Sequence, residues 1–157
     1  MKIDPESYLL AIETFLKANL NTEITDLNTE KNDAIVLKSI STDAYFLQTL
    51  NDKVANYNPY ILIGLDDIQS VGIGPATGKK MIFSIVIIIQ DSIEDLLIGR
   101  RMLRYGRVLE DLLNRSFNKI ICHATFTIQS LVPIAITSVN TNDPYRAVGV
   151  QVETTLG

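Results

Sequence analysis

The apolar residues near the N-terminus recur every three or four positions, a spacing that places them on one face of a helix. They follow Asp4 and Pro5, which supply an N-cap carboxylate and a proline at the first helical position. The pattern therefore predicts a helix over about residues 5–19. Its apolar positions are Leu9, Ile12, Phe15, Leu16 and Leu20.

The chain between this helix and Asn58 carries shorter patterns. Residues 23–28 and 34–40 predict two strands, and the polar residues 29–33 between them predict a hairpin loop. Residues 42–57 are ambiguous, because Asn51-Asp52 would suit a turn between two short strands. We favour a helix there, since apolar residues recur at helical spacing: Leu47, Leu50, Val54 and Tyr57.

The most apolar stretch of the chain runs from Met81 to Ile89. It predicts a central strand that is covered on both faces. Before it, Asn58-Pro59 breaks the preceding element, and residues 60–63 predict a strand. The composition of residues 71–80, which are rich in glycine, predicts a flexible loop.

The second half of the chain predicts one long helix and three more strands. Asp91 and Glu94 have capping-box spacing, so a helix is expected over about residues 92–116. Strands are expected at about 119–131 and 133–139, and a last strand over 145–156 alternates cleanly. The sequence thus predicts a single α+β domain over residues 1–157. Its mostly antiparallel sheet is packed by the N-terminal helix and the long helix.

Composition and charge agree with one globular domain. Of the 157 residues, 46% are hydrophobic and 20% are charged, which is too apolar for a disordered chain. The net charge of −4 is uneven: residues 1–70 carry eleven acids and five bases (−6), and residues 71–157 carry seven acids and nine bases (+2). This asymmetry would suit head-to-tail self-association, although a solvated acidic face explains it equally simply.

The sequence also bears on the compartment. The single cysteine, Cys122, excludes an intrachain disulfide and favours a reducing compartment. We expect no signal peptide, because the polar start has no apolar stretch followed by a cleavage site. Residues 81–89 are too short to span a membrane as a helix, so a soluble protein is expected.

Five of the six arginines lie on the predicted long helix, and we call these five the arginine stripe. Seven apolar residues form another face of the same helix. Three interpretations stay open: a solvated face with pairs four residues apart, an intersubunit row of salt bridges, or a surface that faces DNA phosphate. We favour a subunit interface, to which Arg146 would also contribute. The stripe consists of Arg100, Arg101, Arg104, Arg107 and Arg115.

Other motifs carry no chemistry that we can assign. The glycine-rich loop lacks the glycine and hydroxyl spacing of a phosphate-binding loop and runs into a strand, not a helix. His123 and Cys122 are neighbours on a predicted strand and face opposite ways, which disfavours a catalytic pair or a metal site. We therefore expect no catalytic residues, metal or cofactor. The loop is instead expected to be a mobile partner contact, through Gly72, Gly74, Gly78, Lys79 and Lys80.

The order of elements resembles the tail terminator, tail completion or neck proteins of tailed bacteriophages and related prophage particles. The shared pattern is an N-terminal amphipathic helix, two early strands, and a Pro-Tyr-Ile strand before a glycine-rich loop. An aliphatic strand, a long helix that reads Gly-Arg-Arg-Met-Leu-Arg-Tyr over residues 99–105, and a closing strand after Asp143-Pro144-Tyr145-Arg146 complete it.

This resemblance implies a non-enzymatic structural protein of the virion, made in the host cytoplasm. It would form a homo-oligomeric ring, usually of six copies, that ends the tail tube and joins it to the head side. Its partners would be the tail tube protein and a head-side connector protein, with DNA only as passing cargo and no membrane. The alternative from the residues is a small intracellular ligand-binding or regulatory domain that uses the 72–80 loop.

Overall fold

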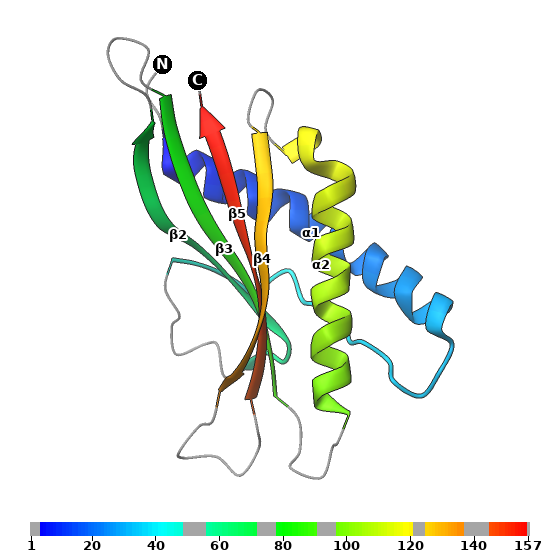
Figure 1. The fold of residues 1–157 in the computed structure, drawn as a ribbon. Helices are drawn as coiled ribbons and strands as arrows, with labels where there is room; N and C mark the ends of the chain where they lie inside the picture. The colour runs from blue at the N-terminus through cyan, green and yellow to red at the C-terminus, as the bar shows by residue number, and fades with distance from the viewer. Residues whose placement is uncertain are drawn as a thin grey trace.

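Two helices pack on one five-stranded sheet, which gives the α+β fold that the sequence predicts (Figure 1). The structure is a computed structural model, and it describes residues 4–48, 56–71, 78–90, 97–120, 125–136 and 145–156. Its elements in chain order are α1 (Pro5–Lys31), β1 (Tyr45–Leu47), β2 (Tyr60–Val71), β3 (Gly78–Gln90), α2 (Ile98–Ile120), β4 (Thr125–Ile136) and β5 (Tyr145–Leu156).

Helix α1 begins as predicted but is much longer than the pattern over residues 5–19 indicates. The Asp4 carboxylate accepts a hydrogen bond from the Glu6 amide, and the helix ends at Lys31, followed by Asn32, which caps it with a left-handed backbone. The strand predicted at 23–28 and most of the loop at 29–33 are therefore wrong. The buried apolar residues continue at helical spacing: Leu16, Leu20, Ile24 and Leu27.

The segment 34–40 is extended but does not join the sheet, so the strand predicted there is also wrong. Two asparagines of α1 bind its backbone instead. Asn28 accepts from the Leu37 amide and donates to the Leu37 carbonyl, both at 2.9 Å. Asn21 makes the same pair of bonds to Ile40, at 2.8 and 2.9 Å. These side chains satisfy backbone groups that a neighbouring strand would otherwise satisfy.

The helix favoured over residues 42–57 is also contradicted where the structure describes it. Residues 45–47 form β1, which pairs in parallel with Ile61–Ile63 of β2. Gln48 ends this strand with a φ of 64°, in the left-handed region. Residues 49–55 lie outside the described part of the chain.

The sheet has the order β1-β2-β3-β5-β4, and every pair except β1–β2 is antiparallel. The residues 81–89 lie in β3, which is the central strand, as predicted. The strand predicted at 60–63 is confirmed as the start of β2, which continues to Val71 with a bulge between Leu65 and Asp67. Residues 78–80 belong to β3, and 72–77 lie outside the described residues.

The prediction that β3 is covered on both faces holds only near the end of the strand, where Ile88 on the second face is buried. Phe83, Ile85 and Ile87 are buried, and Phe83 stacks on Tyr8 of α1 with ring centroids 6.4 Å apart. The alternate positions Ile82, Ser84 and Val86 are only half-buried. Figure 1 shows α1 passing behind the strands and α2 standing beside β4. Among the described elements, no helix covers the second face, which we call the open face.

The last two strands agree with the prediction except that no break occurs before Pro133. The last strand, β5, is confirmed, and Val148, Val150 and Val152 are buried on its inner face. The strands predicted at 119–131 and 133–139 are one strand, β4, in which Pro133 pairs with Val148. Proline is tolerated there because β4 lies at the edge of the sheet.

Helix α2 confirms the predicted long helix with shifted bounds. It runs to Ile120, past the predicted end at residue 116 and into the start predicted for a strand. The expected capping residues Asp91 and Glu94 lie outside the described residues. The apolar face is confirmed, with Met102 half-buried and the others buried: Ile98, Tyr105, Val108, Leu109, Leu112 and Leu113.

Candidate functional site

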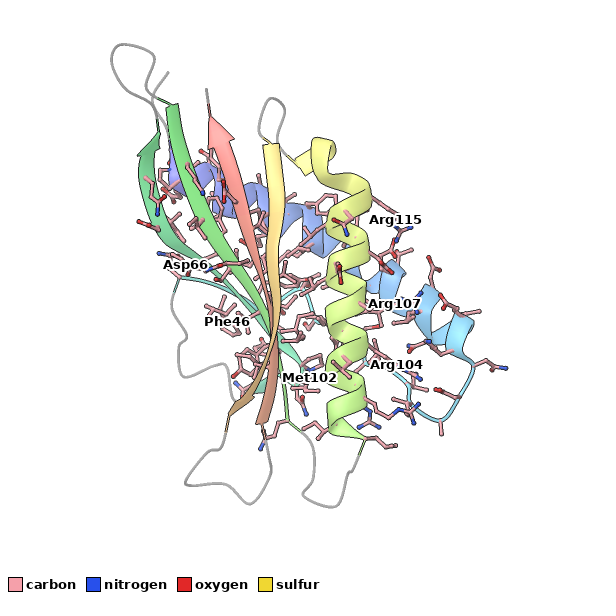
Figure 2. All side chains as sticks on the ribbon, in the orientation of Figure 1. Phe46, Asp66, Met102, Arg104, Arg107 and Arg115 are labelled. Atoms are coloured by element: carbon pink, nitrogen blue, oxygen red, sulfur yellow. The ribbon has the colours of Figure 1, made fainter. Side chains whose placement is uncertain are left out.

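The arginine stripe of α2 faces the second half of α1, and three of its members bind acidic residues of that region. The deepest is Arg104, which is 9% exposed. Its guanidinium binds both carboxylate oxygens of Asp33, at 2.8 and 2.5 Å, and donates to the Ile35 carbonyl at 2.5 Å. Arg104 therefore holds the end of α1 and the start of the extended segment against α2. Figure 2 shows Arg104, Arg107 and Arg115 on the side of α2 that faces this region.

The other two pairs lie nearer to solvent. Arg107 binds both carboxylate oxygens of Glu30 at 3.1 Å and also approaches the Asp111 carboxylate at 3.4 Å. Arg115 binds Glu23 and donates to the Asp111 carbonyl at 3.2 Å. These groups line a polar cleft of about 190 Å³ between α1 and α2. Because exposed ion pairs contribute little to stability, Arg104 is the main polar anchor of the two helices.

The arginines also shift the pKa values of their partners. The hydrogen bonds from Arg104 hold the pKa of Asp33 at about 2, below its ordinary 3.8, and the charge of Arg100 adds to this effect. The hydrogen bonds from Arg107 lower the pKa of Glu30. Both carboxylates therefore stay charged well into the acid range.

The remaining arginines are placed differently. Arg100 is exposed, whereas Arg101 is half-buried and lines a cavity of about 20 Å³ with Lys38 and Tyr105. Arg146 lies in β5, where its backbone pairs with Ile89 of β3. The interpretation of the stripe as a subunit interface stays a prediction, and Arg100 is the stripe residue best placed for it.

The predicted partner loop lies only partly within the described residues. Gly72 and Gly74 lie outside them, whereas Gly78 and Lys79 pair in β3 with Val71 and Ser70 of β2. Lys80 is also in β3, and its ammonium lies 2.8 Å from the Glu153 carboxylate of β5. The loop interpretation therefore applies to residues 72–77 alone.

The other candidates for chemistry give no site. His123 and Cys122 lie outside the described residues. Asp66 and Asp67 are in β2, and Asp66 accepts hydrogen bonds from Ser84 and, at 3.4 Å, from Gln151. Figure 2 shows Asp66 on the β2 side of the sheet, away from the arginines. Within the described ranges, no group of three or more histidine, cysteine or acidic residues is arranged to hold a metal ion.

Sequence reasoning missed the acidic partners of the stripe. It assigned Glu23 and Glu30 to a strand and a loop, so they were not expected beside α2. The spacing of Leu20, Ile24 and Leu27 is the signal that would have extended α1, because it places all three on one helical face. Glu23 and Glu30, seven residues apart, would then share a face as well.

Comparison with known proteins adds no relative. No protein-family model matches this chain, and no curated protein matches it. No helix in the described part of the chain is both long enough and apolar enough to cross a membrane.

The Arg104–Asp33 pair makes stability depend on pH. Because the pKa of Asp33 is lower in the folded than in the unfolded chain, its stabilisation is complete above pH 3.8 and is lost as the pH falls toward about 2. We expect Arg104→Met to remove this part of the pH dependence. Unfolding in denaturant at several pH values between 2 and about 6 would measure it.

Other carboxylates also titrate in this range, so the comparison is between variants. Arg107→Met is the matched control, because Glu30 and Arg107 are more exposed than Arg104. It should change the pH dependence less. Equal acid dependence in the unaltered chain and in Arg104→Met would contradict this assignment.

Proposed function

We propose that this chain is a non-enzymatic structural protein that forms a head-to-tail ring at the end of a bacteriophage tail tube. The observation that carries the proposal is the one-sided sheet. Four long strands are backed by two helices on one face. On the other face, the described side chains at one end are buried, among them Tyr60, Ile88 and Ala147, and the remaining described ones are half-buried or exposed. Such a subunit can present a broad sheet face to the lumen of a ring and keep its helices behind it.

The charge of the open face supports this role. Asp66, Asp67 and Glu153 lie on it, and Lys80 is the described base that pairs there with Glu153. Binding to nucleic acid requires basic groups that neutralise phosphates, so this face would repel DNA rather than hold it. A lumen that DNA must pass through benefits from such a surface.

The order of elements also supports the proposal, with one correction. The N-terminal helix, the Pro-Tyr-Ile strand, the aliphatic strand, the long helix and the closing strand are present in that order. The two early strands are replaced by the second half of α1 and the extended segment. In the proposed particle, the ring would contact the tail tube protein on one side and a head-side connector protein on the other.

Light scattering after size exclusion tests the ring directly. The expected result is a single closed oligomer, of about six copies by the resemblance, with a central hole in electron micrographs. Assembly with the tail tube protein should be measured as well, because a terminator can require that partner. A chain that stays monomeric alone and with the tube protein would overturn the proposal.

Arg100 tests whether the stripe contributes to assembly. Charge reversal at Arg104 or Arg107 would break the in-chain pairs, whereas Arg100 is exposed. We expect Arg100→Glu to weaken the ring and Arg100→Lys, which keeps the charge, to preserve it. Intact rings in Arg100→Glu would remove the stripe from the proposed interface.

A further inference from the structure

Both outer edges of the sheet offer unpaired backbone within the described residues. At one edge, β4 pairs only with β5. At the other edge, β1 covers only Ile61–Ile63 of β2. The Gln48 side chain accepts a hydrogen bond from the Leu65 amide. After Leu65, no described strand pairs with the outer edge of β2. A strand edge of this kind can pair with another chain.

The two open edges lie at the same level of the sheet. The ladders connect Gln69 of β2 to Thr125 of β4 through Lys80 and Thr155. They connect Gly64 to Ser130 in the same way, through Ser84 and Gln151. The uncovered part of β2 therefore stands level with residues 125–130 of β4.

The opposite end of the sheet is blocked at both edges. There β1 covers Ile61, and the residue of β4 at the same level is Pro133, which has no amide hydrogen to donate. The unpaired half of one edge thus lies at the same level of the sheet as the unpaired half of the other edge. The two blocked halves also lie at one level.

The bulges of the two edge strands match too. Asp66 is the extra residue of β2, between Leu65 and Asp67, and Gln129 is the extra residue of β4, between Ile128 and Ser130. Gly64 and Ser130 share one level of the sheet, and Asp67 and Thr127 share another. The two levels are three residues apart in both strands. Because each strand contains one extra residue between these levels, the two strands are in the same register before and after their bulges.

Strand directions are compatible with a head-to-tail contact. Successive antiparallel pairs make β2 and β5 run one way and β3 and β4 the other. When one copy is placed beside another in the same orientation, β4 of the first meets β2 of the second antiparallel. Because the open halves are level, the contact needs no shift along the strands. A heterologous contact of this kind closes into a ring when the rotation between successive copies closes.

We propose that copies of this chain join by pairing residues 125–130 of β4 with residues 64–69 of β2 in the next copy, which continues the sheet around the ring. The inference rests on the proposed ring, since it names the surface through which the copies meet. Backbone hydrogen bonds supply the contact, and the matched bulges and blocked ends fix its register.

Cysteine crosslinking of the assembled protein tests this pairing. In a Cys122→Ser background, Asp67→Cys with Thr127→Cys places one thiol on each edge at the same level. Facing residues of antiparallel strands have Cα atoms about 4.5–5.5 Å apart, within the range that a disulfide bridges. We expect oxidation to give a ladder of covalent oligomers that ends at the ring's copy number. Gln69→Cys with Thr125→Cys is a second pair, two residues further along each strand, and should behave alike.

Three comparisons make the result decisive. Each single cysteine variant should stay monomeric in a denaturing gel, and a covalent dimer from one alone would indicate a two-fold contact and overturn the pairing. Leu62→Cys with Val132→Cys lies at the blocked end and should give no ladder. A ring by light scattering with no ladder from either open-edge pair would overturn the edge contact and leave the ring intact. A chain without oligomers would overturn both proposals.

Discussion

Replacement of Thr22 by proline is expected to lower the free energy of unfolding by about 3 kcal/mol or more. Thr22 is exposed and lies in the middle of α1, which runs from Pro5 to Lys31. Proline would remove the amide that bonds to the Ala18 carbonyl, and its ring would clash with that carbonyl. Denaturant unfolding followed by circular dichroism measures the loss.

The matched control is Thr22→Ala, which keeps the amide and has a better helix propensity. It should raise stability by a few tenths of a kcal/mol, about the difference between the two residues. The pair distinguishes one long helix from the sequence-based prediction of a helix that ends near residue 19. If that shorter helix were correct, proline at position 22 would have little effect.

Replacement of Ile85 by alanine is expected to cost about 2–5 kcal/mol of stability, the range for large aliphatic side chains in a packed core. Ile85 is fully buried on the inner face of β3, where it lies level with Ile63 of β2 and Val150 of β5. The truncation would leave a cavity beneath the helices. Thermal and denaturant unfolding would both report it.

The control is Ile82→Ala on the open face of the same strand. Ile82 is only half-buried, so removal of the same atoms takes less apolar surface out of the folded state. Its cost should be clearly smaller than that of Ile85→Ala. Equal costs at the two positions would mean that β3 is covered on both faces, as the apolar run of residues 81–89 predicts by itself.

The comparison of Ile82 with Ile85 shows where a local sequence pattern predicts the structure correctly and where it does not. The apolar face of α2 is correct because helical periodicity is a property of neighbouring residues. The apolar run of β3 correctly predicts the strand and its central position, but its second face is covered only near Ile88 and not at Ile82. Ile82 and Ile85 are the same residue type, and only the placement of the helices decides which of them is buried.

The arginine stripe shows the same division. Its presence on one helical face follows from spacing alone. Its partners do not, because Asp33 is 71 residues from Arg104 and Glu23 is 92 residues from Arg115. No local signal connects such residues. The prediction of α1 as a short helix also placed the acids in the wrong elements.

The sequence alone determined the parts of this protein that depend on residues close in the chain: the start of α1, strands β3 and β5, the apolar face of α2 and the α+β class. The tertiary structure decided the rest. The second half of α1 has apolar residues at helical spacing, but the partners of its asparagines and acids lie in the extended segment and in α2. Pro133 fits inside β4 because that strand is at the edge of the sheet. In each case the deciding energy comes from groups far apart in the chain, which a local pattern does not contain.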